Sequence, residues 1–147
     1  MLFNVDSNCS PDLLYCLAQM GHGDELVIAD RNFPATSTAL QTGFQTLIPM
    51  PGFSALSAIQ TITSLLPLDG FVDHAAVWME IDSLPDEMNE SHTAVFSFLE
   101  GIIPEGAGLG HMPRLKFYER AREAFAVVQT SEDIAYGCYI LRKGVIF

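Results

Sequence analysis

The chain has 147 residues, 49% of them hydrophobic, which is enough for one compact domain that buries roughly two thirds of its unfolded surface. Its formal net charge is −11. A protein that binds nucleic acid or an anionic membrane surface needs a basic stripe to neutralise phosphates, and the few Lys and Arg residues are scattered. The composition therefore predicts a single domain and argues against both kinds of partner.

The N-terminus carries neither the basic nor the apolar region of a signal peptide, and no apolar stretch reaches the length of a membrane span. The three cysteines, Cys9, Cys16 and Cys138, are odd in number and lack the CxxC spacing of a metal or redox site. These features predict a cytoplasmic protein with reduced thiols.

Helix and strand patterns alternate through the first half of the chain. Ser10-Pro11-Asp12 supplies the cap, the proline and the early acid that open a helix. Short apolar runs at 26–30 and 44–48 predict two buried strands, and the turn residues at 31–38 predict a loop between them. Apolar residues at helical spacing then predict a helix over 54–66.

The second half continues the alternation. The predicted segments are a strand at 75–81, a helix at 85–99, a glycine-rich loop at 101–113, a helix at 116–124 and strands at 125–130 and 137–141. Alternating strands and helices favour an α/β fold, here one domain over 1–147 with a central sheet flanked by helices on both faces.

A histidine between two glycines, His22 in Gly21-His22-Gly23, directly precedes the first apolar run. The reference pKa of an imidazole is about 6.5, so at cellular pH this side chain can both donate and accept a proton. The flanking glycines leave it uncovered. Asp24 and Asp30 flank the run, and two interpretations are open. In the functional one they orient the ring or bind a ligand hydroxyl; in the structural one Asp24 caps a turn and Asp30 ends a strand. A metal site at these residues is disfavoured because no second histidine stands at a ligand spacing.

Near the other end of the chain, Arg114, Tyr118 and Tyr136 offer one cation and two phenols, which suit the hydroxyls of a sugar. Each has a structural alternative, because the arginine can pair with an acid and the tyrosines can fill the core. The glycines of 106–110 superficially suggest a phosphate-binding turn, but Pro113 intervenes before any helix, so this run is interpreted as a loop. The sequence contains no P-loop and no GxSxG elbow.

Several motifs, taken together, resemble one known family. They are Ser10-Pro11-Asp12-Leu13-Leu14, Met20-Gly21-His22-Gly23-Asp24-Glu25, Asp30 with Phe33-Pro34, Phe117-Tyr118-Glu119-Arg120-Ala121 with Ala124-Phe125-Ala126-Val127-Val128, and Tyr136-Gly137 with Leu141-Arg142-Lys143-Gly144. In order and spacing they resemble the L-fucose mutarotase branch of the ribose pyranase and fucose mutarotase family. The resemblance covers nearly the whole chain, from about residue 2 to residue 145.

The resemblance implies an α/β fold, a ring-shaped homodecamer and a sugar site that a neighbouring subunit completes. The site residues it implies are His22 as the catalytic acid and base, with Asp30, Arg114, Tyr136, Gly137 and Cys138 around the sugar. We add Tyr118 as a second acid by hypothesis. Cys138 stands where family members commonly carry asparagine, so a weak thiol donor replaces an amide.

The implied activity exchanges the α and β anomers of L-fucose or a related monosaccharide. The ring opens when the anomeric hydroxyl loses a proton and the ring oxygen gains one, so acid and base groups suffice and no cofactor or metal is expected. A pocket for this 6-deoxy sugar also needs an apolar wall for its methyl group, for which Phe33 or Trp78 is the candidate. Two alternatives stay open: a ribose-type pyranase that interconverts pyranose and furanose rings, and a monosaccharide-binding protein without turnover.

Overall fold

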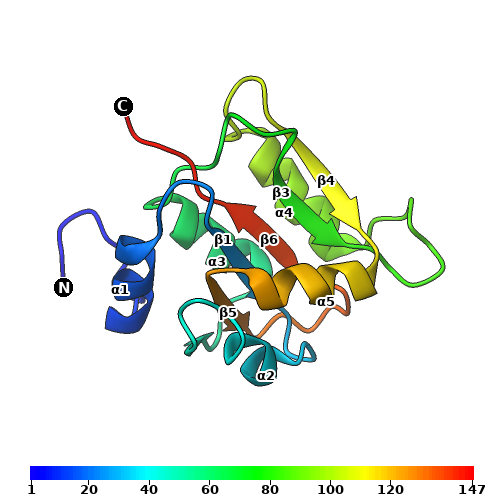
Figure 1. Cartoon of the computed structure of the whole chain (residues 1–147), viewed down its shortest axis with the longest axis horizontal. Helices are drawn as coiled ribbons and strands as arrows, with labels where there is room; N and C mark the ends of the chain where they lie inside the picture. The colour runs from blue at the N-terminus through cyan, green and yellow to red at the C-terminus, as the bar shows by residue number, and fades with distance from the viewer.

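The computed structural model describes all 147 residues and places them around one six-stranded sheet with the strand order β2-β5-β1-β6-β3-β4 (Figure 1). In chain order the elements are α1 (Pro11–Gln19), β1 (Glu25–Ala29), α2 (Ala35–Ala39), β2 (Leu47–Met50), α3 (Ala55–Thr63), β3 (His74–Met79), α4 (Glu90–Glu100), β4 (Gly108–Met112), α5 (Arg114–Glu123), β5 (Ala126–Thr130) and β6 (Tyr139–Arg142). None of the helices is both long and apolar enough to cross a membrane.

Side chains alternate across the central strand β1 and feed two hydrophobic cores. Leu26 and Ile28 point to the face covered by α1, α3 and α4, whereas Val27 and Ala29 point to the face covered by α2 and α5. All four are fully buried, as expected for a strand with helices on both sides. The predicted fold class, a central sheet flanked by helices on both faces, is confirmed.

Strand direction gives the sheet two unlike edges. β1 is parallel to β5, and β5 is parallel to β2; β3 is parallel to β4. β6 runs antiparallel to both β1 and β3, so it is the one reversed strand. The five parallel strands therefore all end at the same edge, which we call the carboxyl edge, and begin at the opposite amino edge. Loops at the carboxyl edge are where ligands commonly bind in such sheets.

Two predicted loops contain regular structure instead. The segment 101–113 includes β4, whose glycines concealed a strand pattern: a Cβ on Gly110 would lie 2.7 Å from the ring of His74 on β3, so only glycine fits there. The segment 31–38 includes most of α2, a helix of five residues without a side-chain cap, too short to show a period in the sequence.

Two other boundaries also differ from the predictions. Helix α4 begins at Glu90 rather than near residue 85, because the side chain of Asn89 accepts a hydrogen bond from the His92 backbone and caps the helix there. Strand β2 lies at 47–50, shifted toward the C-terminus of the predicted run at 44–48. The remaining predicted helices and strands match the structure to within about three residues, the usual uncertainty of element ends.

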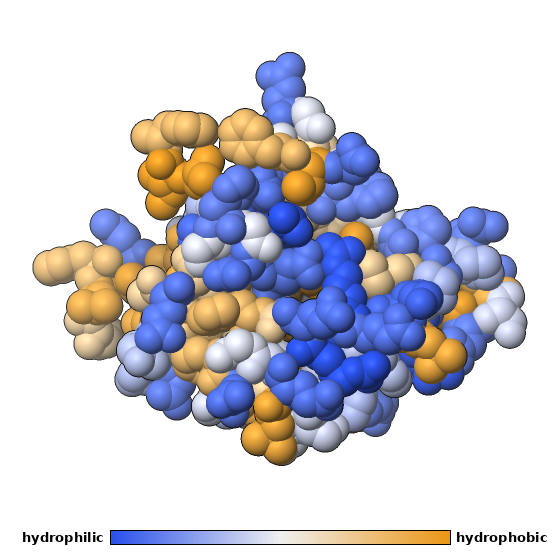
Figure 2. Space-filling view, in the orientation of Figure 1, coloured by the Kyte–Doolittle hydropathy of each residue, from blue (hydrophilic) through white to orange (hydrophobic).

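Hydrophobic residues are also exposed at both ends of the chain. Figure 2 shows a mainly hydrophilic face with hydrophobic patches where Figure 1 places the N-terminal and C-terminal segments. The exposed apolar side chains include Met1, Leu2, Phe3, Ile146 and Phe147. Apolar side chains gathered in this way are typical of surfaces that contact another protein.

A close approach of two backbone segments positions the loop before β3. Gly144 donates its N–H to the Pro67 carbonyl at 2.8 Å, and a Cβ at Gly144 would overlap the carbonyl oxygen of Leu68. We expect Gly144→Ala to lower the free energy of unfolding by about 2 kcal/mol through overpacking. Gly43→Ala is the control, since its Cβ would come no closer than 3.6 Å to another group. Urea denaturation of both variants checks this, and equal midpoints would contradict it.

Candidate functional site

A pocket of about 200 Å³ opens at the carboxyl edge of the sheet, where the loop after β1 and the end of β3 meet α5 and the loop before β6. Its lining residues are Asp30, Asn32, Phe33, Met79, Arg114, Tyr118, Ala135 and Tyr136. The volume is below that of a typical pocket for a drug-sized molecule, about 300 Å³ or more, and so suits a smaller ligand. Of the predicted sugar-binding residues, Asp30, Arg114 and Tyr136 thus share one pocket, together with Tyr118, the predicted second acid.

Asp30 directly follows β1 and is 3% exposed. Its Oδ1 accepts hydrogen bonds from the backbone N–H groups of Asn32 and Phe33, both at 2.9 Å. This turn holds the carboxylate in one orientation. Both of these backbone donors bind Oδ1, and the Cys138 thiol lies within hydrogen-bonding reach of the same carboxylate.

Arg114 and Tyr118 project from the same side of α5, one helical turn apart. The Arg114 Nε donates to both carboxylate oxygens of Asp82, at 3.0 and 3.1 Å, and its guanidinium carbon lies 5.6 Å from the centre of the Tyr118 ring. The Tyr118 ring in turn packs edge-on against Phe33, with 5.2 Å between ring centres. These contacts, together with a side-chain hydrogen bond between Arg114 and Tyr118, fix a cation and a phenol at the pocket.

Only the first residue of the predicted segment Tyr136-Gly137-Cys138 lines the pocket. Tyr136 adopts a left-handed backbone conformation with φ of 64°, which is strained for a residue other than glycine. Gly137 and Cys138 are buried behind it. The sulfur of Cys138 accepts the Asp30 backbone N–H at 3.4 Å, and burial together with the Asp30 carboxylate raises the pKa of the thiol well above its ordinary value. Cys138 is therefore a protonated thiol that holds the backbone of Asp30 in place.

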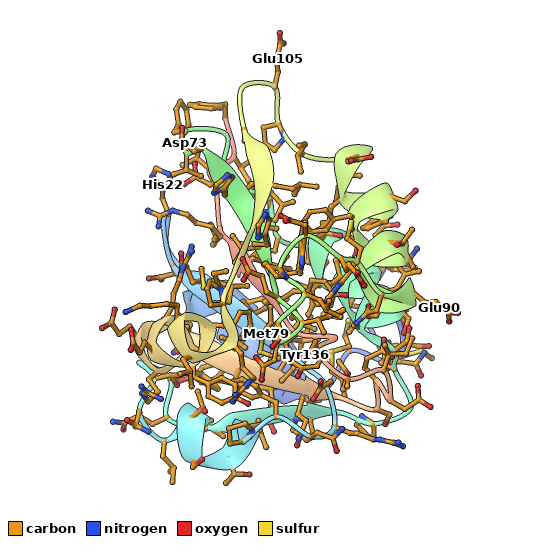
Figure 3. All side chains as sticks on the ribbon, turned by 90° about the vertical axis from the view of Figure 1, so that its right-hand side faces the viewer. His22, Asp73, Met79, Glu90, Glu105 and Tyr136 are labelled. Atoms are coloured by element: carbon orange, nitrogen blue, oxygen red, sulfur yellow. The ribbon has the colours of Figure 1, made fainter.

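His22 lies at the other edge of the sheet. It precedes β1 while Asp30 follows it, and five strand residues at about 3.3 Å each separate the two ends by about 16 Å. Figure 3 shows His22 at one end of the molecule, well away from Met79 and Tyr136 at the pocket. Asp30, one of the two predicted partners of the His22 ring, is therefore not brought next to His22 within one chain.

Asp69 is the side chain that contacts His22. Its Oδ2 lies 3.2 Å from the His22 Nε2, and the His22 ring packs edge-on against Phe71 with 6.0 Å between centres. Asp24, considered earlier as a partner, instead accepts the Gly21 N–H at 2.7 Å and caps the turn. The His22 side chain is half exposed, so its other face is open to a ligand or to another protein.

Asp69 is itself buried in a network of charges. Arg142 donates from Nε to its Oδ2 at 3.2 Å and also contacts Glu25, which forms a two-pronged ion pair with Arg120. Burial alone would raise the pKa of Asp69, but hydrogen bonds from the Phe71 amide, His22 and Arg142 outweigh it and hold that pKa below its ordinary value. The carboxylate is therefore kept charged beside His22.

Sequence reasoning missed Asp69 because nothing in its local pattern marks it. It stands 47 residues from His22 and reaches it only because the chain after Pro67 pairs with the end of β6. Arg142 was part of a recognised motif, although its contact with Asp69 was not foreseen. No three His, Cys, Asp or Glu side chains gather closely enough to hold a metal ion.

Residues 4–146 match the RbsD / FucU transport protein family, which is nearly the whole chain. The chain belongs to this family. Within the RbsD/FucU family, the human protein named fucose mutarotase is 42% identical over 149 residues, an alignment that covers 99% of this chain and 94% of the human protein. The L-fucose mutarotase of Histophilus somni is 37% identical over 148 residues, covering 99% of this chain and 97% of its own. The resemblance inferred from the motifs is confirmed.

Solved structures of RbsD/FucU proteins share the fold. The fucose mutarotase of Streptococcus pneumoniae in complex with L-fucose superimposes with a TM-score of 0.86 at 35% identity, covering 99% of this chain and all of the other. RbsD of Bacillus subtilis complexed with D-ribose matches with a TM-score of 0.73 at 20% identity over the full length of both chains, which supports the fold alone.

The pKa of Asp69 makes a prediction about acid stability. Because the folded pKa is below the unfolded one, the charged carboxylate stabilises the protein above pH 4 or so, and this stabilisation is lost as the pH falls through the lower folded pKa. Asp69→Asn should cost about 2 kcal/mol near neutral pH and progressively less in acid. Asp73→Asn, at an exposed site, should show no such pH-dependent difference. Denaturant titrations from pH 7 to pH 3 or so measure both, and a cost for Asp69→Asn that is constant with pH would contradict the assignment.

Proposed function

We propose that this protein is an isomerase, a mutarotase that interconverts the α and β anomers of L-fucose as one domain over residues 1–147 and without a cofactor. The observation that carries the proposal is full-length similarity to proteins named fucose mutarotase, one of them solved with L-fucose bound. The pocket supports it, because a carboxylate, a guanidinium and two phenols converge there on a volume suited to a monosaccharide.

The chemistry requires only proton transfers. The anomeric hydroxyl loses a proton, the ring oxygen gains one, the C1–O5 bond breaks to give the open-chain aldehyde, and rotation about C1–C2 lets the ring close on the other face. In the proposed mechanism His22 moves the proton, with Asp69 orienting its ring. Asp30, Arg114 and Tyr136 hold the sugar hydroxyls, and Tyr118 acts as the second acid.

A second copy of the chain must supply His22 to each pocket under this proposal. The separation of His22 from Asp30 by the length of β1 supports it, as does the half-exposed His22 ring. Exposed apolar side chains surround that ring: Phe71 contacts it, and Phe147 contacts Phe71 with 6.5 Å between ring centres. We propose the homodecamer implied by the family resemblance as the assembly, and a cytoplasmic location in keeping with three free cysteines.

L-fucose is favoured over ribose as the substrate. The relatives that are named for fucose are 34–42% identical to this chain, whereas the ribose-bound relative is 20% identical. Phe33 lines the pocket and offers an apolar surface to the sugar methyl group. Trp78, the other candidate for that role, is buried in the opposite core and does not line the pocket.

His22→Gln tests the catalytic role. General acid and base groups contribute roughly 10²–10⁴-fold, so the variant should accelerate anomer exchange at least about a hundredfold less than wild type. Asp30→Asn should also exchange anomers more slowly. Its amide oxygen can still accept the backbone N–H groups of Asn32 and Phe33, but the negative charge is lost. His74→Gln, at a histidine outside the site, is the control and should remain active. An active His22→Gln protein would remove His22 from the mechanism.

Mixing the two inactive variants tests whether the site is shared. In oligomers assembled from equal amounts of His22→Gln and Asp30→Asn chains, about a quarter of the sites combine an intact His22 from one copy with an intact pocket from another. Activity should therefore return to about that fraction of wild type. Mixed oligomers that stay inactive would show that the pocket does not use the His22 of a neighbour.

Sugar preference separates the proposal from its alternatives. Magnetisation exchange by NMR should show faster exchange between the α and β anomers of L-fucose than between the ring forms of D-ribose at equal protein concentration. Faster pyranose–furanose exchange of ribose would favour a ribose-type pyranase. Saturable fucose binding without any acceleration would favour a sugar-binding protein.

A further inference from the structure

Helix α4 begins directly beside the segment that carries Tyr136. His92, in the first turn of α4, is fully buried, although a histidine can avoid the cost of burial only if its ring nitrogens find partners. The proposed mechanism gives this residue no role. The His92 ring packs against the rings of Trp78 and Tyr139, whose centres lie 5.8 and 6.0 Å from its own.

Both ring nitrogens of His92 have partners. The Asn89 backbone N–H donates to Nδ1 at 3.3 Å, and Nε2 lies 2.8 Å from the carbonyl oxygen of Tyr136. Burial lowers the pKa of His92, so the ring is neutral at neutral pH. Because Nδ1 accepts a hydrogen bond, the single ring proton is on Nε2, which donates it to the Tyr136 carbonyl.

The Tyr136 backbone needs such support. Its left-handed φ of 64° is strained, and the next residue has no room for a side chain, since a Cβ on Gly137 would lie 2.7 Å from the Glu132 Cγ and 2.9 Å from the Ile134 carbonyl oxygen. The preceding carbonyl, that of Ala135, accepts from the Asn89 side chain at 2.9 Å. Two successive carbonyls of this segment are therefore held by the first residues of α4.

We propose that His92 is a positioning residue, which holds Tyr136 in its strained conformation through the Nε2–H bond to the Tyr136 carbonyl and so keeps the phenol in the pocket. This inference rests on the proposed function for what Tyr136 binds. It differs from a packing role for His92, because packing needs only the shape of the side chain, whereas positioning needs the donor.

Two substitutions of matched length separate these roles. His92→Met fills the space without a donor, and His92→Gln places an amide N–H₂ where Nε2 was. We expect His92→Met to raise the KM for L-fucose by about tenfold with a smaller change in kcat, and His92→Gln to restore the KM to within about threefold of wild type. Phe96→Leu is the control for lost stability. Phe96 lies in the same helix as His92 and packs on Trp78 of β3, so the variant loosens this core but should leave the KM unchanged.

Hydrogen exchange of residues 131–138 provides a readout that does not depend on turnover. The backbone amides of this segment should exchange faster in His92→Met than in wild type, and at the wild-type rate in His92→Gln. Equal KM and equal exchange in His92→Met and wild type would overturn the inference, as would a His92→Gln protein that behaves like His92→Met. If wild type exchanges no anomers, the mutarotase proposal fails, and the hydrogen-exchange comparison alone still decides whether His92 holds the segment.

Discussion

Burial of β1 on both faces is the constraint on which the rest of the molecule depends. A strand whose four apolar residues all enter a core cannot curve away or offer its own side chains to a ligand, so its functional groups lie at its two ends. Asp30 at one end joins residues from the end of β3, from α5 and from the loop before β6. His22 at the other end joins Asp69 and Arg142. The two halves of the proposed chemistry are held apart by the same packing that stabilises the fold.

The fold and several site residues could be predicted from the sequence wherever they depend on patterns of neighbouring residues. Alternating strand and helix patterns predicted the layers, and the family resemblance implied Asp30, Arg114 and Tyr136, which the structure gathers in one pocket. The features that the sequence did not predict, strand β4 and the role of Asp69, depend on contacts between distant segments. Strand β4 was hidden because the ring of His74 leaves no room for a side chain at Gly110, and nothing in the sequence around Asp69 indicates its partner 47 residues away.

Electrostatics divides the two edges of the sheet. At the amino edge, a linked series of hydrogen bonds and ion pairs runs from His22 through Asp69 and Arg142 to Glu25 and Arg120. At the carboxyl edge, Asp30 and Arg114 do not pair with each other: Arg114 pairs with Asp82, and Asp30 accepts from backbone N–H groups. On an otherwise acidic chain, this difference suits one edge to orient a proton-transferring group and the other to receive neutral hydroxyls.

The placement of His22 and the pocket at opposite edges bears on the geometry of any assembly that unites them. A head-to-tail chain of copies joins each histidine to the next pocket but leaves one unmatched histidine and one unmatched pocket at its ends. Closing that chain into a ring removes both ends at once, so every copy gains a complete site. Symmetry would then serve catalysis as well as stability, and a substitution on the surface around His22 would change quaternary structure and turnover together.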